Sequence, residues 1–323
     1  MQSILSSSQR PSLGLVIPIY RNEASIDDLL EAVGHIARSV ECAFEAIFVV
    51  DGSPDLSYAL LHEKLPACEF RSQLVALTRN FGAFPAIRAG LELSRSDLTA
   101  VMAADLQEPP ELVISFWNKF ATTPYDVAFG VREGRKDPVS SRLASSLFWS
   151  VYRRIILNDI PKGGVDIFAV NREFRERLLT LNEAHSSLLG QLFWLGGQRE
   201  FVSYERRERQ HGRSAWTFRK KLRYLSDSVF AFTDLPVRML TALGLLALMF
   251  TTLLGVLVVI AKLSGWVQVP GYAGTILTIL FFGALNSLGL GIVGTYAWHA
   301  FENTKARPLS IKQSVKAFEK ESK

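Results

Sequence analysis

Two long stretches without charge near the C-terminal end constrain this chain more than any other feature. Residues 239–261 and 263–301 contain no Asp, Glu, Lys or Arg. The hydrocarbon core of a bilayer is roughly 30 Å thick, and a helix needs about 20 apolar residues to cross it. Core helices of soluble proteins rarely run this long without one charge. The pattern therefore predicts two transmembrane helices, over about 239–261 and 273–298, joined by a short loop.

The positive charges around these stretches predict their orientation. The loop at 262–272 carries only Lys262. The flanking segments are rich in Lys and Arg, with Arg219, Lys220, Lys221, Arg223 and Arg238 before the first helix and Lys305, Arg307, Lys312, Lys316, Lys320 and Lys323 after the second. Because such segments stay on the cytoplasmic side, both termini are expected in the cytoplasm, in a multi-pass protein of the inner or plasma membrane.

The remainder of the chain has the pattern of an α/β domain. Short apolar runs at 13–19, 45–50, 74–78 and 98–104 alternate with segments of helical period, such as 25–40. This alternation predicts βαβ units and a mostly parallel sheet that helices cover on both faces. An apolar fraction of 48% with 21% charged residues excludes a disordered chain.

Polar and acidic residues follow three of these runs, at 18–23, 51–53 and 105–110. Ligands of parallel sheets bind beyond the carboxyl ends of the strands, so the three segments are expected to converge on one crevice. One carboxylate at a strand end caps a helix as often as it binds a ligand. The combination with later arginines (Arg132, Arg135, Arg142, Arg206, Arg207, Arg209 and Arg213) suits a diphosphate bound with a divalent metal. No GxGxxG or P-loop motif is present, which disfavours hydride-transfer enzymes and P-loop NTPases.

Ordered motifs along nearly the whole chain carry a resemblance to a known family. They are VIPIYRNEASI (16–26), VVDGSPD (49–55), LTRNFG (77–82), ADLQEPPEL (104–112), GVREGRKDP (130–138), GGVDIFAVNR (163–172), YERRERQHGRSAW (204–216), FTDLPVRML (232–240) and KARP (305–308). The arrangement resembles the family 2 glycosyltransferases of the GT-A fold. Within them it resembles the polyprenyl-phosphate glycosyltransferases, a group that includes dolichol-phosphate mannose synthase and undecaprenyl-phosphate glycosyltransferases.

The resemblance implies a role for each matching residue. The nucleotide sugar would be bound by Pro18, Tyr20, Glu23, Val49, Asp51 and Ala104. Asp105 and Gln107 match a metal-binding pair for Mg²⁺ or Mn²⁺. Asp105, Arg132 and Arg209 would be the catalytic residues, and the acceptor phosphate would meet Arg206, Arg213 and Ser214. Asp166 would either position the acceptor or stabilise a loop, and the structural role is the favoured one.

Several positions depart from the family pattern. Val50 and Ala103 stand where acidic residues are usual, Ala215 replaces a Lys, and Asn22 and Thr295 each replace a Glu. The loss at Ala103 leaves one carboxylate and one amide for the metal. These departures keep a second hypothesis open, in which the chain is a non-catalytic membrane scaffold that binds nucleotide sugars. A polysaccharide synthase is a third hypothesis, but the Gln-x-x-Arg-Trp motif of those enzymes is absent.

The resemblance also implies a domain organisation: a flexible N-terminus (1–12), a cytoplasmic GT-A domain (13–235) with interfacial helices at about 141–157 and 216–232, two transmembrane helices within 236–301, and a basic cytoplasmic tail (302–323). The enzyme would move a sugar, with inversion, from a nucleotide diphosphate to a polyprenyl phosphate in the membrane. Small residues in the second membrane helix are compatible with a homo-oligomer. No nucleic-acid partner is expected.

Overall fold

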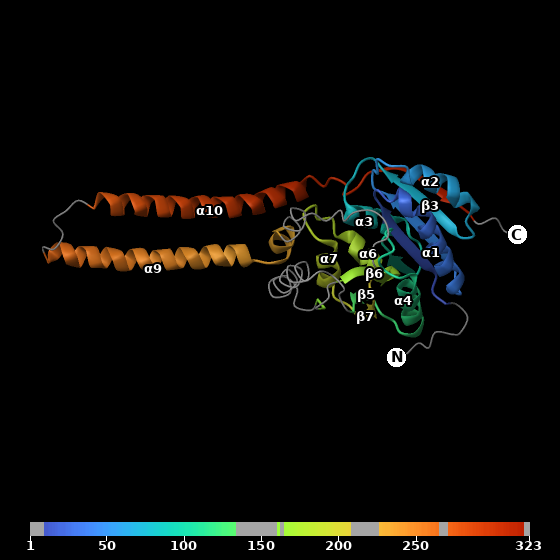
Figure 1. Cartoon of the computed structure of the whole chain (residues 1–323). Helices are drawn as coiled ribbons and strands as arrows, with labels where there is room; N and C mark the ends of the chain where they lie inside the picture. The colour runs from blue at the N-terminus through green and yellow to red at the C-terminus, as the bar shows by residue number, and fades with distance from the viewer. Residues whose placement is uncertain (1–9, 134–159, 162–164, 208–225, 265–270, 320–323) are drawn as a thin grey trace.

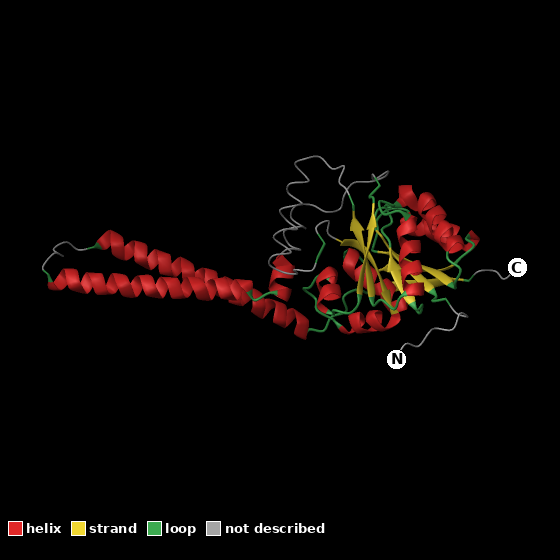
Figure 2. Ribbon diagram, turned by 90° about the horizontal axis from the view of Figure 1, so that it is seen from below, coloured by secondary structure: helices red, strands yellow, loops and turns green. Residues whose placement is uncertain are grey.

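The computed structural model of the chain describes residues 10–133, 160–161, 165–207, 226–264 and 271–319. An α/β domain forms most of it, and two long helices extend from one side of that domain (Figures 1 and 2). The interfacial helix expected at 141–157 lies outside the described residues, as does the first part of the one expected at 216–232. Residues 226–232 of the latter are helical.

A single mixed sheet organises the domain, in the order β7-β5-β6-β4-β1-β2-β3-β8. Strands β1 to β5 and β7 run in the same direction, whereas β6 and β8 pair antiparallel with their neighbours. The mostly parallel α/β sheet expected from the alternating pattern is therefore confirmed. The strands are β1 (Leu13–Ile19), β2 (Phe44–Val50), β3 (Arg71–Leu77), β4 (Leu98–Val101), β5 (Val127–Arg132), β6 (Val165–Asn171), β7 (Arg199–Tyr204) and β8 (Lys312–Phe318).

Helices cover both faces of this sheet because side chains along each strand alternate between them. On one face, Leu15 and Ile17 of β1 join a buried cluster with α1 (Ile26–Ser39), α2 (Ser57–Lys64) and α4 (Pro110–Thr122). On the other face, Val16 joins a cluster with α3 (Ala83–Leu93), α6 (Arg172–Thr180) and α7 (Leu188–Trp194). The described part of the domain also contains 3₁₀ turns at Glu23–Ser25 and Leu65–Ala67. Because a buried cluster packs against each face of the sheet, the ends of the strands, from which the polar loops extend, are held in place.

Helices α9 (Leu235–Leu263) and α10 (Tyr272–Thr304) leave the domain as an antiparallel pair (Figure 1). Both are longer than the apolar stretches alone predicted, because their ends continue into polar residues such as Arg238, which pairs with Asp234 at 2.8 Å. Among the described residues, one helix has the length and apolar composition to cross a membrane, over Leu235–Leu257. Its large side chains are exposed, with Met249 at 68% and Phe250 at 62%.

The chain returns to the sheet after α10. Residues 312–318, expected to belong to a basic tail, form strand β8 against β3, with Val315 opposite Val75. The amide of Thr78 donates to the carbonyl of Ile311 at 3.0 Å and extends this pairing. Strand β8 covers an edge of β3 that would otherwise expose unpaired backbone groups. The end of the helical pair is thereby tied to the α/β domain.

Candidate active site

The loops that follow the parallel strands meet at one edge of the sheet. Because β1, β2, β3, β4, β5 and β7 run in the same direction, residues 20–23, 51–57, 78–82, 105–108 and 205–207 share that edge. Direct contacts join these loops, since Ser25 Oγ donates to the carbonyl of Ala104 at 3.2 Å and the amide of Arg21 donates to Ser53 Oγ at 2.8 Å. The expected convergence of the loops after β1, β2 and β4 is confirmed.

Asp55 holds the loops after β1 and β2 together. Its carboxylate accepts hydrogen bonds from the hydroxyls of Ser53 (2.5 Å) and Ser57 (2.8 Å) and from the amide of Glu23 (3.1 Å). Burial opposes ionisation of this carboxyl group, but the hydrogen bonds outweigh it and hold the pKa of Asp55 below its ordinary value. The ionised group is thus part of the scaffold at this edge.

Replacing Asp55 with Asn is expected to make the thermal stability of the protein vary less with pH in the acid range. A carboxyl group with a lowered folded-state pKa stabilises the protein fully above its unfolded pKa, about 3.9, and loses that contribution as the pH falls through the folded value. The wild type should therefore exceed Asp55→Asn in thermal midpoint at pH 6, and the gap should shrink below about pH 4. Thermal unfolding from pH 7 to pH 3 checks this, and a gap that stays constant contradicts it.

Asp51, the expected nucleoside-binding carboxylate, lies buried at the end of β2, with 3% of its surface exposed. Its two carboxylate oxygens accept hydrogen bonds from the amides of Phe81 (2.7 Å) and Gly82 (2.8 Å), in the loop after β3. Burial raises the pKa of Asp51, and these amides oppose the shift. Asp51 therefore fixes the position of the β3 loop, and any contact with a nucleoside would add to that role.

The other residues expected to bind the nucleotide sugar differ in accessibility. Pro18 and Tyr20 are half-buried, and exposed Glu23 accepts a hydrogen bond from the amide of Leu56 at 3.0 Å. The side chains of Val49 and Ala104, by contrast, are buried in the two core clusters, so they support the loops through packing. Asn22, in place of a family Glu, accepts a hydrogen bond from the amide of Tyr20 and so stabilises a tight turn.

The expected metal pair lies in a tight turn after β4. Leu106 has a φ of +53°, and the amide of Gln107 donates to Asp105 Oδ1 at 3.3 Å. The side-chain oxygen of Gln107 accepts a hydrogen bond from Arg206 at 2.5 Å, and its carbonyl accepts one from the amide of Arg207 at 2.9 Å. The segment after β7 is thus joined to the turn after β4, although it is about 100 residues away in the sequence.

Glu108 is a carboxylate at this turn that sequence reasoning missed. It is buried, with 2% of its surface exposed, and its Oε1 lies 4.0 Å from Arg206 Nε. Its signal was its position directly after Gln107 on a strand-end loop. Asp105, Gln107 and Glu108 together offer the hard oxygen atoms that Mg²⁺ and Mn²⁺ prefer, so this donor set fits a divalent metal.

The remaining expected site residues differ in where they lie and in how much of them the structure describes. Arg132 ends β5 opposite Tyr204, which places it at the carboxyl edge. Asp166 belongs to antiparallel β6, which starts at that same edge, but its side chain is not described. Arg206, expected to meet the acceptor phosphate, donates a hydrogen bond to the side chain of Gln107, and its role toward the acceptor stays a prediction. Arg209, Arg213 and Ser214 lie outside the described residues.

Mostly parallel α/β sheets bind their ligands beyond the carboxyl ends of the strands, and here that edge carries acidic and amide oxygens. The chain belongs to glycosyl transferase family 2, whose model matches residues 15–180, and it is a glycosyltransferase. It is 28% identical to an uncharacterized glycosyltransferase of Synechocystis sp., over 93% of this chain and 94% of that one. It is likewise 28% identical to the bactoprenol glucosyl transferase of Shigella phage SfX, over 94% of this chain and 99% of the relative.

Among solved structures, the chain is similar to glucosyl-3-phosphoglycerate synthase of Mycobacterium tuberculosis, which was crystallised with Mn²⁺ and uridine diphosphate. The identity is 18% and the TM-score is 0.48, over 68% of this chain and 78% of that one.

Proposed function

We propose that this glycosyltransferase transfers a sugar from a nucleoside-diphosphate donor to a polyprenyl phosphate at the membrane surface. The observation that carries the proposal is the 28% identity to a bactoprenol glucosyl transferase along 94% of this chain, which takes in the helical pair as well as the α/β domain. Helix α9 supports it because it is apolar enough to lie in a membrane. A lipid acceptor remains in the bilayer, so its enzyme needs an anchor that keeps the site at that level.

The departing nucleoside diphosphate presents the main chemical difficulty. Asp105, Gln107 and Glu108 would hold a divalent metal, Mg²⁺ or Mn²⁺, at the edge where the phosphates of the donor would bind. Such an ion, when bound, stabilises negative charge that develops on the leaving group. Arg206, which contacts Gln107, would orient that side chain and place a guanidinium beside the phosphates.

The acceptor needs little activation. A phosphate monoester has a second pKa of about 6, so its oxygen is already anionic near pH 7 and no strong general base is required. Direct attack of that oxygen on the anomeric carbon breaks the bond to the diphosphate and inverts the configuration. Arg132, at the end of β5, is placed on the edge where it would contact the donor.

The helical pair is proposed to cross the membrane twice, over about 239–261 and 273–298, with both termini in the cytoplasm. The excess of Lys and Arg on the domain side of both helices supports this orientation. At the domain end of α10, Lys305 Nζ lies 5.1 Å from the ring of Trp298 and 4.3 Å from that of Phe301. Aromatic and basic residues of this kind gather where a membrane meets water. Assembly into a homo-oligomer would use the small residues of α10.

Replacing Arg206 with Ala is expected to lower kcat by about 10- to 100-fold, because Gln107 and Glu108 lose the guanidinium that positions them. Arg207→Ala is the matched control. Its guanidinium pairs with the exposed Glu111 at 3.3 Å, and surface ion pairs contribute little. Steady-state transfer assays on the two variants check the prediction, and equal losses would contradict it.

The proposed function is tested with the full-length protein in detergent or nanodiscs. It is supplied with undecaprenyl phosphate, Mg²⁺ or Mn²⁺, and a panel of radiolabelled UDP- and GDP-sugars. Transfer of label into a lipid product that mild acid releases would support the proposal. Nucleotide binding by calorimetry without lipid product from any donor would support the scaffold hypothesis instead.

A further inference from the structure

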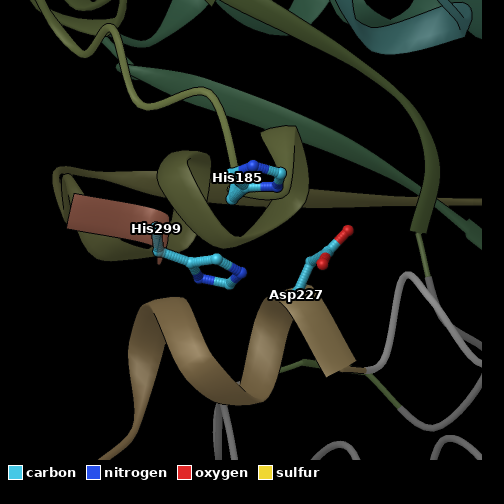
Figure 3. A group of neighbouring side chains, drawn as sticks. All are labelled: His185, Asp227 and His299. Carbon is cyan, nitrogen blue, oxygen red and sulfur yellow. The ribbon is translucent and has the colours of Figure 1, made fainter. Parts of the chain in front are cut away.

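A second group of candidate metal ligands lies away from the sheet edge, where the α/β domain joins the helical pair. His185, Asp227 and His299 each offer one ligand atom, and these atoms all lie within 4.8 Å of one another. His185 comes from the loop before α7, Asp227 from the helix at 226–232, and His299 from the end of α10 (Figure 3). Three segments that are far apart in the sequence thus meet at one point.

The surroundings of this group are packed. The ring of Phe230 lies edge-on to those of Tyr296 (5.2 Å) and His299 (5.8 Å), which joins the helix at 226–232 to α10. The amide of Ala184 donates to Asn303 Oδ1 at 2.9 Å, which joins the loop before α7 to the same helix. All three candidate ligands are half-buried. The three candidate ligands therefore lie close together because the helix at 226–232 and the loop before α7 both pack against α10.

The two imidazoles are stacked, with ring centroids 4.5 Å apart and planes within 7° of parallel. Figure 3 shows the three side chains close together, with the ring of His299 extending toward Asp227 and the ring of His185 above them. Two histidines and one carboxylate form a ligand set typical of zinc sites, whereas Mg²⁺ prefers oxygen ligands alone. Tetrahedral coordination at about 2.0–2.1 Å would bring the ligand atoms to roughly 3.3 Å apart, and the two rings would turn out of their stacked arrangement to direct one nitrogen each at the ion.

We propose that His185, Asp227 and His299 bind one zinc-type divalent cation that fastens the α/β domain to the end of α10. The site is separate from the carboxyl edge of the sheet, and its chemistry selects a different metal from the one proposed there. Water completes the coordination, and the ion joins a loop of the domain, the helix at 226–232 and the end of α10. The inference does not depend on the proposed sugar transfer.

The test uses full-length protein in detergent that has been stripped with EDTA and freed of chelator. Zn²⁺ is titrated against a chromophoric chelator in the presence of 1 mM Mg²⁺, and Co²⁺ is titrated by visible absorption. The wild type should bind one equivalent of Zn²⁺ and show the intense bands of tetrahedral Co²⁺. His185→Ala and His299→Ala should each weaken Zn²⁺ binding by at least tenfold and abolish the Co²⁺ bands. Asp227→Asn, which keeps the shape of the side chain, should also weaken Zn²⁺ binding.

Two control variants separate this site from others. His35→Ala removes an exposed histidine of α1 and should leave Zn²⁺ binding unchanged. Asp105→Asn should also leave it unchanged, whatever its effect on sugar transfer. Zn²⁺ should raise the thermal midpoint of the wild type but not that of His299→Ala. Binding that is unaffected in both His185→Ala and His299→Ala, or no binding able to compete with the chelator, would overturn the proposal.

Discussion

Replacing Asp105 with Asn is expected to lower kcat for sugar transfer by at least about 100-fold, with a small change in the affinity for lipid acceptor. Ala103 carries no carboxylate, and the Asp105 carboxylate accepts a hydrogen bond from the amide of Gln107 at 3.3 Å, so Asp105 is the proposed metal ligand whose charge is tested here. Asn keeps the shape of the side chain but removes its negative charge, and transition-state stabilisation of this kind contributes roughly 3–4 kcal/mol. The measurement is initial rates with Mg²⁺ or Mn²⁺ varied over a wide range.

The matched control for this variant is Asp28→Asn, which removes an exposed aspartate from the outer surface of α1. It should retain full activity and the wild-type dependence on metal. Glu108→Gln adds a second comparison, because Glu108 is the other carboxylate of the turn. If Asp105→Asn kept more than a tenth of the wild-type kcat, the metal would have to be held elsewhere and the assignment of the turn would be wrong.

The sequence allowed the architecture to be predicted because the information is local. Apolar runs such as 13–19 mark buried strands directly, and the helical period at 25–40 marks α1. The rule that parallel strands present their carboxyl ends at one edge then placed Asp51 and Asp105 together without any knowledge of side-chain contacts. Spacing alone does not decide whether a carboxylate at a strand end caps a helix or binds a ligand. The resemblance of the motifs to the family suggested the roles of these residues.

Contacts between distant segments could not be predicted in the same way. Strand β8 contains few apolar residues, and it becomes a strand because the edge of β3 offers it hydrogen bonds. The hydrogen bond between Arg206 and Gln107 joins the loop after β7 to the loop after β4, two strands that do not neighbour one another in the sheet. His185 and His299 are 114 residues apart in the sequence, and they meet because the loop before α7 packs against the end of α10.

Replacing Gly52 with Ala is expected to destabilise the protein by about 2–4 kcal/mol and to reduce nucleotide affinity at least tenfold. Gly52 has a φ of +54°, which L side chains rarely adopt, and a Cβ there would lie 2.2 Å from the carbonyl carbon of Arg79. The loop after β3 would have to move, and Asp51 would lose the amides of Phe81 and Gly82. Left-handed strain and overpacking each contribute roughly 1–3 kcal/mol.

Gly196→Ala separates backbone strain from steric overlap. Gly196 also has a positive φ, +74°, but among the described residues no atom lies within 4 Å of the point that its Cβ would occupy. Backbone strain alone should cost that variant about 1 kcal/mol and leave nucleotide binding unchanged. Chemical denaturation in detergent gives the stabilities, and calorimetry with UDP and GDP gives the affinities. Equal destabilisation of the two variants would mean that the close approach of Gly52 to Arg79 does not constrain the loops at the carboxyl edge of the sheet. A larger effect at Gly52 would show that the contact between the β2 and β3 loops holds Asp51 in place for its ligand.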